Sequence, residues 1–555
     1  MLKNYFTNLV EKAAEKAFGF DIASDFTAVC EKPKNPEFGD FAINVSALAK
    51  TTKKAPPLIA QEIAGHISLE NFEVNIVAGF INFKVKDEIL LSVIKEILQR
   101  QKNYGANETG KGQKINLEYV SANPTGPFHI GHGRWAAVGS CLASVLKFSG
   151  YEVYQEFYIN DAGGQIQKLG KSLEIRIKEL NGEAVEYPED WYPGEYLIDC
   201  AKKYIETAAT EDYAEFAKCE MLRLQKEFLK KFRVHFDCFF SELSLYSGGE
   251  VEKCLEKLEH SGKLFEKDGA LWFKTTDFGD DQDRVIKKAN GDNTYLTADI
   301  AYHYNKLQRG FDHLINIWGA DHHGYVARMK AAVSALGYDS CRLEVLLGQL
   351  VNIIEQGDRV RMGKRKKMVT LEELVEDVGV DATRFWMLMR SIDTTLDFDI
   401  DLAKTQSDKN PVFYVQYAHA RACSILRRAL ETRLDTETGT QSPALLNQAE
   451  LEDYFKNPTF ENLFDEKSKE SIKKLVLRLE EYKSIVEGAA KARTPYLLCK
   501  YTQDLASDFH HFYNFTRVLD EDKNATLARL SIVESVRLVM SSALDLMGVE
   551  AVERM

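Results

Sequence analysis

The spacing of apolar and polar residues predicts different structures at the two ends of the chain. Residues 1–20 carry apolar side chains at helical spacing beside Glu and Lys, which predicts an amphipathic helix. Residues 72–85 are rich in strand-forming residues around Gly79, which predicts two strands joined by a turn. After about Lys404 the pattern is helical to the last residue, except for the polar residues 435–443, which predict a loop.

The middle of the chain predicts a parallel strand–helix–strand unit. Apolar and polar side chains alternate over residues 115–119, the pattern of a half-buried strand. Residues 121–133 are rich in glycine and proline, and apolar residues then recur at helical spacing until Gly150. Residues 153–159 again have the pattern of a strand. Because a helix joins the two strands, we expect them to run parallel with a right-handed crossover.

The rest of the middle stretch predicts further strands and helices. Residues 165–236 are charged and mostly helical in pattern. A strand at 314–318, a helix at 325–336 and an apolar run at 343–354 follow. Thr370 and Glu373 have the spacing of a capping box, which predicts the start of another helix.

Length and composition indicate a globular protein of several domains. A chain of 555 residues exceeds what one hydrophobic core supports, so we expect three or four domains. No apolar run approaches the roughly 20 residues that cross a bilayer. The N-terminal helix lacks the apolar block of a signal peptide and contains acids that a transit peptide would lack. We therefore expect a cytoplasmic protein without a membrane partner.

Charge and cysteine content narrow the chemistry only slightly. The net charge is −13, whereas a nucleic-acid binder usually has a basic excess. Phosphate contacts depend on local patches, however, so the total does not exclude such a partner. None of the nine cysteines forms a C-x-x-C pair, so we expect reduced thiols and no metal site in the protein.

The first chemical signal is the sequence SANPTGPFHIGH at residues 121–132, between a predicted strand and a predicted helix. A turn in this position directs backbone N–H groups and the helix dipole at an anion. Gly126, Gly131 and Gly133 let a nucleotide approach the backbone. His129 and His132 can donate hydrogen bonds to phosphate oxygens whose charge grows in the transition state. Two histidines three apart are a weak signal alone, and their position in this unit favours a nucleotide site.

The HIGH sequence at residues 129–132 resembles the signature of class I aminoacyl-tRNA synthetases. The preceding SANPTGP, YINDAGG at 158–164 and YLTADI at 295–300 resemble arginyl-tRNA synthetases in particular. Residues 393–402, VQYAHAR at 415–421 and the ending at 544–555 agree with them. The resemblance therefore runs from near residue 30 to the last residue, and its motifs occur in the context they require.

The resemblance implies an α/β protein with a Rossmann-like parallel-sheet catalytic domain, an α+β N-terminal domain and an all-α C-terminal domain. We expect a tRNA-contacting domain at residues 1–107, a catalytic domain with insertions at 108–404 and an anticodon-binding domain at 405–555. The implied reaction is ATP-dependent activation of L-arginine and its transfer to the 3′-terminal adenosine of tRNA. Mg²⁺ on the ATP phosphates is implied as well, as is a need for bound tRNA before activation. We expect a monomer.

The resemblance also implies roles for single residues. The implied catalytic residues are His129, His132 and Lys364, and the implied ATP-binding residues are these three with Pro124, Gly126 and Gly131. For arginine, it implies Glu118 and Asn123 at the ammonium and carboxylate end and Tyr295 and Asp299 around the guanidinium. His322 stands where many relatives carry glutamine. A guanidinium pairs best with carboxylates, and leaving these acids unpaired is costly, so such a pocket rejects neutral analogues.

The second class I signature departs from the family pattern. Where the family has Lys-Met-Ser-Lys-Ser, residues 361–365 read Arg-Met-Gly-Lys-Arg. Lys364 matches the second lysine, which is expected to stabilise charge as the bond between the α and β phosphates breaks. Arg361 keeps the charge of the first lysine without its point-like geometry, and Gly363 replaces the serine. The roles of Arg361 and Gly363 therefore stay open.

Aromatic and basic residues of the C-terminal stretch are candidates for tRNA binding. Unpaired anticodon bases are usually read by stacking on aromatic rings and by hydrogen bonds. The candidates are Tyr414, Tyr417, Phe512 and Tyr513 for bases and Arg421, Arg427 and Arg428 for phosphates. Most aromatic residues at helical spacing belong to a core, so we expect only one or two to act, Tyr417 first and with it Arg421.

Two other interpretations stay open on the sequence. Another class I synthetase, such as the cysteinyl enzyme, is disfavoured by the missing cysteine and histidine metal ligands and by the N-terminal domain. A non-catalytic relative that only binds tRNA has its support in the irregular residues 361–365. The intact His129, His132 and Lys364 oppose that second alternative.

Overall fold

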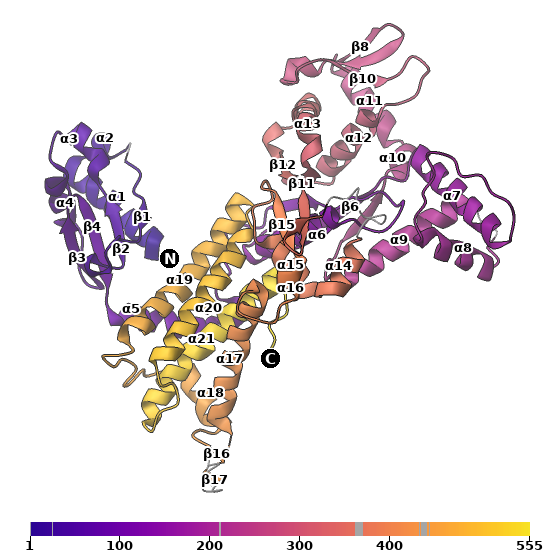
Figure 1. Ribbon diagram of the computed structural model, residues 1–555. Helices are drawn as coiled ribbons and strands as arrows, with labels where there is room; N and C mark the ends of the chain where they lie inside the picture. The colour runs from indigo at the N-terminus through magenta and orange to yellow at the C-terminus, as the bar shows by residue number, and fades with distance from the viewer. Residues whose placement is uncertain are drawn as a thin grey trace.

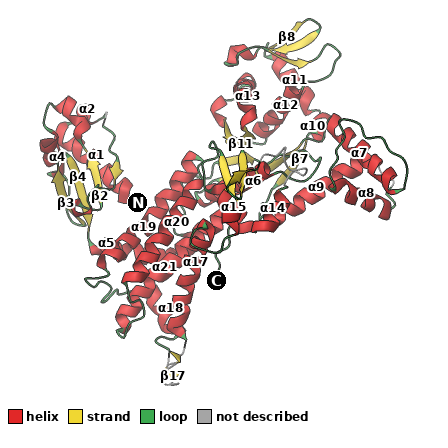
Figure 2. Ribbon diagram, viewed as in Figure 1, coloured by secondary structure: helices red, strands yellow, loops and turns green. Residues whose placement is uncertain are grey.

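The computed structural model describes residues 2–24, 26–209, 212–360, 370–431, 433–434, 441–442 and 444–555. The chain forms an α/β part with a parallel sheet, an α+β unit before it and a helical unit after it. The α/β part is named the catalytic part below because it spans the catalytic domain that the resemblance implies. The N-terminal unit stands beside the helical unit, and two insertions extend from the catalytic part (Figure 1). Figure 2 shows how the strands gather in the N-terminal unit, the centre and one insertion. The fold class implied by the sequence is confirmed.

The N-terminal unit is a four-stranded antiparallel sheet with helices packed on it. Its sheet order is β1-β2-β4-β3, and Gly79, with φ +88°, turns β3 into β4 as the sequence predicts. Phe6 on the first helix lies 4.3 Å from Phe83 and 5.2 Å from Phe41, measured between ring centroids. The elements are α1 (Leu2–Phe18), α2 (Phe20–Ala23), β1 (Cys30–Glu31), β2 (Phe41–Asn44), α3 (Ala49–Thr52), α4 (Pro56–Ala64), β3 (Phe72–Val77), β4 (Phe80–Val85) and α5 (Asp87–Arg100).

The catalytic part is organised around a five-stranded sheet whose order is β12-β11-β5-β6-β7. All four neighbouring pairs are parallel, which confirms the predicted strand–helix–strand unit. The elements are β5 (Lys114–Glu118), α6 (Ile130–Phe148), β6 (Glu152–Ile159), β7 (Cys238–Ser241), α12 (Tyr295–Gln308), β11 (His313–Gly319), α13 (His323–Ala335) and β12 (Leu343–Gly348).

The prediction of a half-buried strand at residues 115–119 is wrong in one respect. Asn116 is 0% exposed and Glu118 is 6% exposed, so the polar positions of β5 are as buried as the apolar ones. A central strand of a parallel sheet is covered on both faces, and its polar side chains must then find partners inside the protein. Glu118 has such a partner in Lys306, whereas both side-chain polar atoms of Asn116 are buried without a hydrogen-bond partner among the described residues. The alternation in the sequence therefore marks buried polar positions rather than a solvent face.

Two insertions interrupt the catalytic part. The first follows β6 and is helical, as the sequence predicts, with α7 (Gly164–Leu180), α8 (Tyr196–Glu206) and α9 (Tyr213–Lys231). The second lies between β7 and α12 and contains a small antiparallel sheet of order β10-β9-β8. Its elements are α10 (Leu243–Ser247), α11 (Glu250–His260), β8 (Leu264–Lys267), β9 (Ala270–Phe273) and β10 (Arg284–Lys287).

The apolar run at residues 343–354 belongs to two sheets. Its first half is β12 of the central sheet, and its second half is β13 (Val351–Glu355), which pairs with β14 (Asp358–Arg359) and parallel to β15 (Leu396–Asp399). Thr370 caps α14 (Leu371–Val378) through the predicted capping box with Glu373. The helices α15 (Val380–Leu388) and α16 (Ile400–Lys404) complete this part.

The C-terminal unit is a helical bundle built around its last helix, α21 (Lys523–Met547), most of whose residues are buried. Its elements are α17 (Pro411–Leu430), α18 (Gln448–Lys456), α19 (Lys469–Ala492), α20 (Tyr496–Phe515) and α21 (Lys523–Met547). Between α17 and α18 two short strands pair, β16 (Arg433–Leu434) with β17 (Gln441–Ser442), where the sequence predicts only a loop. Among the described residues, no helix is long and apolar enough to cross a membrane.

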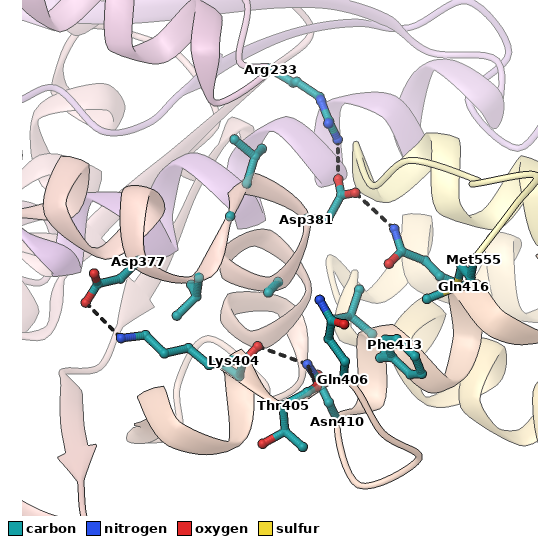
Figure 3. Close-up of a pocket in the computed structure, with 16 residues that line it drawn as sticks. Arg233, Asp377, Asp381, Lys404, Thr405, Gln406, Asn410, Phe413, Gln416 and Met555 are labelled. Carbon is teal, nitrogen blue, oxygen red and sulfur yellow. Dashed lines mark hydrogen bonds and ion pairs between the residues drawn. The ribbon is translucent and has the colours of Figure 1, made fainter.

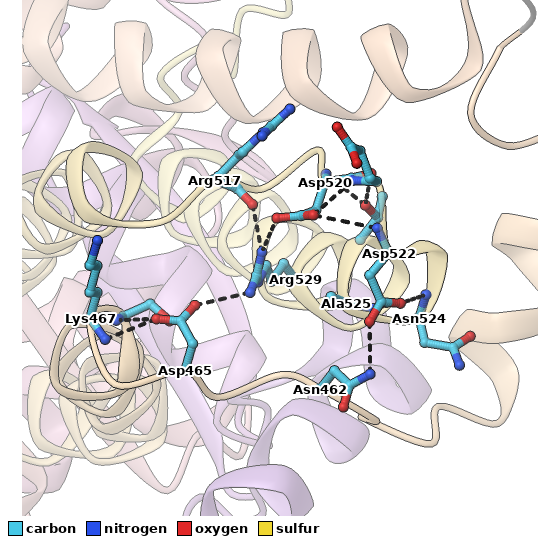
Figure 4. A network of polar contacts seen from close by, with 12 residues as sticks. Asn462, Asp465, Lys467, Arg517, Asp520, Asp522, Asn524, Ala525 and Arg529 are labelled. Atoms are coloured by element: carbon cyan, nitrogen blue, oxygen red, sulfur yellow. Dashed lines mark hydrogen bonds and ion pairs between the residues drawn. The ribbon is translucent and has the colours of Figure 1, made fainter.

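A polar network closes the end of the bundle at the start of α21 (Figure 4). Arg529 donates to the carbonyl oxygen of Arg517 at 2.8 Å and to the carboxylates of Asp520 at 3.2 Å and Asp465 at 3.0 Å. Asp522 accepts from the backbone of α21 and from Asn462. These contacts join the loops before α19 and α21, so they serve the fold of the bundle.

Arg384 joins the catalytic part to the bundle. It is 1% exposed and donates to the carbonyl oxygens of Met547 and Phe232 and to the hydroxyl of Ser140, at 2.8–3.0 Å. Burial lowers its pKa to about 10. This side chain thus satisfies three acceptors from three distant segments.

Replacing Arg384 with methionine should lower the free energy of unfolding by about 2–4 kcal/mol, because it leaves buried acceptors without donors. Urea-induced unfolding followed by fluorescence measures the change. Arg390, which is exposed, is the matched control, and its methionine variant should stay within about 0.5 kcal/mol of the wild type. An unchanged unfolding midpoint in Arg384→Met would contradict this role.

Candidate functional site

The central sheet has a crevice position at the carboxyl ends of β5 and β11. The chain moves from β5 to β6 on one side and returns to β11 on the other, so the strand order reverses between β5 and β11. In open parallel sheets, ligands bind outside the carboxyl ends of the strands at such a reversal. Glu118 ends β5 here, and the turn at residues 119–129 leads from it into α6.

His129 and His132 lie together at the N-terminus of α6. Their rings are stacked with centroids 3.6 Å apart, and the backbone N–H of His129 donates to Nδ1 of His132 at 3.3 Å. Burial lowers the pKa of both side chains, and the neighbouring His129 lowers that of His132 further, so both are neutral at pH 7. Because Nδ1 of His132 accepts a hydrogen bond, its proton is on Nε2, which remains a donor for a ligand.

The glycines of the turn have packing roles in this structure. A Cβ atom at Gly126 would lie 2.9 Å from the hydroxyl of Tyr196, and one at Gly133 would lie 2.5 Å from Leu371. At Gly131 it would lie 2.9 Å from the ring of His129. The turn is also held by the side-chain amide of Gln225, which donates to the carbonyl oxygens of Asn123 and Gly126. Pro124 is buried within the same turn.

A cluster of acids lies next to this turn. Asp299 on α12 is half-buried and accepts a hydrogen bond from Tyr325 at 2.5 Å. Removal from water and the charge of Glu118 raise the pKa of Asp299 to about 6. Glu242 is 4% exposed, and burial together with the charges of Asp299 and Asp161 raises its pKa to about 7. Carboxyl groups with raised pKa values and little compensating positive charge are poised to pair with a cationic ligand.

Glu242 is a residue that the sequence interpretation missed. It directly follows β7, at the same edge of the sheet as the end of β5. Its carboxyl group is close enough to Tyr158 and Asp299 for each to affect its pKa. The available signal was an acid directly after a run of apolar strand residues, since strand ends of a parallel sheet meet at one edge.

The other residues predicted to bind the amino acid lie around this cluster with different exposure. Asn123 lies in the turn, and its side-chain amide donates to Oε1 of Gln165 at 2.9 Å. His322 is exposed in the short turn after β11, and its protonated form lowers the pKa of Asp299. Tyr295 begins α12, so it shares a helix with Asp299 as expected, but its side chain is 75% exposed. The structure thus brings Glu118, Asp299 and His322 together and leaves Tyr295 at the rim.

Lys364 and the irregular residues Arg361, Gly363 and Arg365 lie outside the described residues. The residue that follows this segment, Thr370, pairs with His129 in an isolated β-bridge. Leu371 also donates from its backbone to the carbonyl oxygen of Phe128 at 2.9 Å. The segment therefore ends against the histidine turn. Among the described residues, no group of three His, Cys, Asp or Glu side chains has the arrangement of a metal site.

The candidate tRNA residues form an aromatic cluster on α17 and α20. Arg421 donates to the hydroxyl of Tyr417 at 2.7 Å, and its guanidinium lies 4.6 Å from the ring of Tyr417 and 4.9 Å from that of Tyr513. Tyr417 is 39% exposed, whereas Phe512 is fully buried, so Phe512 belongs to the core, as expected for most of these candidates. Tyr414 contacts His510 at the edge of the cluster.

A cavity of about 780 Å³ lies where the catalytic part meets α17 (Figure 3), and none of the proposed arginine-binding residues lines it. Arg233 pairs with Asp381, which also accepts from Gln416 at 2.9 Å. Lys404 pairs with Asp377 at 3.2 Å. The cations of this cavity are thus engaged with acids, and their contacts join the two parts of the protein.

Comparison with known proteins agrees with this geometry. The family model for the arginyl tRNA synthetase N terminal domain matches residues 4–85, that for the catalytic domain of class I (R) tRNA synthetases matches 93–384, and that for the DALR anticodon binding domain matches 415–555. Together these models cover most of the chain.

Individual relatives match over nearly their whole length. An arginine–tRNA ligase of Oceanobacillus iheyensis is 43% identical over 545 residues, covering 95% of this chain and 94% of that protein. One of Desulfitobacterium hafniense is 44% identical, covering 99% and 98%. The solved arginyl-tRNA synthetase of Thermus thermophilus shares the fold over both whole chains, with a TM-score of 0.75 at 23% identity. The chain therefore belongs to the arginyl-tRNA synthetase family of class I aminoacyl-tRNA synthetases.

Proposed function

We propose that the crevice at the ends of β5, β7 and β11 binds arginine with its guanidinium between Asp299 and Glu242. The family to which the chain belongs activates arginine with ATP and charges tRNA. The observation that carries the proposed site is the pair of carboxyl groups whose pKa values are raised to about 6 and about 7. A guanidinium is always charged and offers paired donors, so it stabilises both acids in their ionised form.

The other end of arginine then lies toward the histidine turn. We propose that Glu118 accepts from the α-ammonium group and that Asn123 contacts the carboxylate end. His322 and Tyr295 line the entrance to the crevice. His322 lies beside Asp299, and Tyr295 lies on the exposed first turn of α12. This orientation directs the carboxylate of arginine at ATP, whose phosphates lie over His129 and His132.

The histidines and Lys364 stabilise the phosphates during activation. The carboxylate oxygen of arginine attacks the α-phosphorus, the bond to the β-phosphate breaks, and pyrophosphate leaves. Each neutral histidine offers one N–H donor for the growing negative charge. Lys364 is six residues before Thr370, and an extended chain of that length spans up to roughly 20 Å, so its ammonium can reach the same phosphates. Mg²⁺ would be brought in on the ATP phosphates and would offset part of their negative charge.

In the second step the 2′-hydroxyl of the terminal adenosine attacks the activated carbonyl, and AMP leaves. We propose that tRNA must be bound before activation, that Tyr417 stacks on an anticodon base and that Arg421 holds the ring in place for it. The cation–π contact of Arg421 already orders this ring in the free protein. The domains are residues 1–107, 108–404 and 405–555, and the protein acts as a cytoplasmic monomer.

Arginine should stabilise the protein more at pH 8 than at pH 6. Asp299 and Glu242 have folded-state pKa values above their usual ones, so the folded state binds more protons than the unfolded state between about pH 4 and pH 7. Both groups therefore reduce the stability of the free protein as pH rises through that window. Bound guanidinium removes this penalty, because it pairs with the ionised forms.

Thermal unfolding with and without arginine at the two pH values tests the proposed site. We expect the shift in Tm caused by arginine to grow from pH 6 to pH 8, whereas citrulline, whose side chain is neutral, should cause little shift at either pH. In Glu242→Gln, the difference between the Tm shifts caused by arginine at pH 8 and at pH 6 should be smaller than in the wild type. A shift in the wild type that is equal at both pH values would overturn the assignment of these two acids.

A further inference from the structure

Lys306 is a buried cation directly behind the arginine crevice. It lies on the last turn of α12 and is 0% exposed. Its ammonium group donates to Oε2 of Glu118 at 2.5 Å and to Oδ1 of Asn316 at 3.3 Å, and it lies 4.2 Å from the centre of the Tyr302 ring. A lysine without any exposure is rare, because its charge must be compensated inside the protein.

The ion pair with Lys306 engages one carboxylate oxygen of Glu118 and leaves the other for different partners. Oε2 is held by Lys306, while Oε1 accepts from the hydroxyl of Ser121 at 3.1 Å and from no other donor among the described residues. That hydroxyl in turn accepts from the backbone N–H of Tyr158 at 3.1 Å, so its own orientation is fixed. A carboxylate oxygen has two acceptor positions, and Oε1 therefore keeps one for a further donor.

A chain of hydrogen bonds links this pair to Asp299 at the other end of the site. The side-chain amide of Asn316, whose oxygen accepts from Lys306, donates to Nε2 of His303 at 2.8 Å. Nδ1 of His303 lies 2.7 Å from the carbonyl oxygen of Asp299. Burial and the charge of Lys306 lower the pKa of His303 to about 3, so the ring is neutral and donates from Nδ1. The donors of these three hydrogen bonds, on Lys306, Asn316 and His303, therefore all point toward Asp299.

We propose that Lys306 is a positioning residue that holds Glu118 so that Oε1 receives the α-ammonium group of arginine. This inference rests on the proposed role of Glu118. Without Lys306, the Glu118 side chain would lose its ion pair and keep only the neutral hydrogen bond from Ser121, so the direction of Oε1 would be less firmly set. Loss of Lys306 should therefore weaken the binding of ligands that carry the amino group and leave the binding of other ligands unchanged.

Two arginine analogues separate this role from general support of the fold. Agmatine keeps the amino group and the guanidinium but lacks the carboxylate, whereas 5-guanidinopentanoate keeps the guanidinium and carboxylate but lacks the amino group. Calorimetric titration of the full-length protein with tRNA gives Kd for arginine and both analogues in the wild type, Lys306→Met and Glu118→Gln. Lys306→Met should raise Kd for arginine and agmatine about 10- to 100-fold, the effect of losing one charge-assisted hydrogen bond. Kd for 5-guanidinopentanoate should stay unchanged.

Lys306→Arg keeps the positive charge, and it replaces Lys306→Met in the same titrations if the methionine variant does not fold. Its planar fork cannot hold one oxygen as an ammonium does, so we expect a smaller loss with the same selectivity for amino-bearing ligands. Equal weakening of all three ligands, or tighter binding of arginine in either variant, would overturn the proposal. If Glu118→Gln is selective but neither lysine variant is, only the role of Lys306 fails. If Glu118→Gln shows no selectivity, the proposed role of Glu118 fails as well.

Discussion

Replacing Asp299 with asparagine is expected to lower kcat/KM for arginine in pyrophosphate exchange about 10²- to 10³-fold. The substitution keeps the shape of the side chain and the partner Tyr325 but removes the charge that pairs with the guanidinium. Loss of one member of a desolvated, hydrogen-bonded charge pair costs about 2–5 kcal/mol, a factor of about 30 to 5,000 that brackets this range. Glu242 remains as a second acid, so binding is weakened rather than abolished.

The specificity of the Asp299 variant is as informative as its rate. A site built for a charged fork rejects a neutral analogue because buried acids stay unpaired, and that penalty is smaller once one acid is gone. The ratio of kcat/KM for arginine over citrulline should therefore fall in Asp299→Asn. Asp292→Asn, which changes an exposed acid shortly before α12, is the matched control. A ratio that stays at the wild-type value would show that Asp299 does not contact the guanidinium.

Replacing His129 or His132 with alanine should lower the rate of arginine activation about 10²- to 10³-fold, with little change in Kd for arginine. Each variant removes one donor to the phosphates, and loss of one such donor typically costs this much in kcat. Because burial keeps both rings neutral, their donors act through the N–H group rather than through charge. Pre-steady-state formation of arginyl-adenylate, with tRNA bound, measures the effect.

The same experiment has two internal controls. His323→Ala removes an exposed histidine at the start of α13 and should leave the rate unchanged. His132→Asn keeps a donor near the same position and should recover part of the lost rate. If alanine at both signature positions leaves adenylate formation intact, the phosphates do not lie over this turn.

Local patterns predicted the parts of the fold that depend on neighbouring residues. The turn at Gly79, the strand–helix–strand unit and the capping box at Thr370 all follow from short-range spacing. Burial of Glu118 did not follow, because it depends on β5 being covered on both faces by segments far away in sequence. The short hairpin of β16 and β17 was missed because two-residue strands leave no periodicity to detect.

The site was predicted where a motif marks it and missed where only tertiary structure brings residues together. The histidine turn could be read from residues 121–132 with their flanking elements. Lys306 could not, because it is a single charged residue whose partner is distant in the chain, and Glu242 had only the signal of an acid directly after a strand. Phe512 shows the opposite case, since helical spacing alone does not tell an exposed ring from a buried one.

The central claim is that this crevice activates arginine alone and does so in a complex with tRNA. Exchange of labelled pyrophosphate into ATP, measured with each of the twenty amino acids in the presence and absence of cognate tRNA, tests it most directly. The account predicts exchange with arginine only, appearing when tRNA is present. Exchange supported by another amino acid, or no exchange in a protein that still binds tRNA, would contradict it.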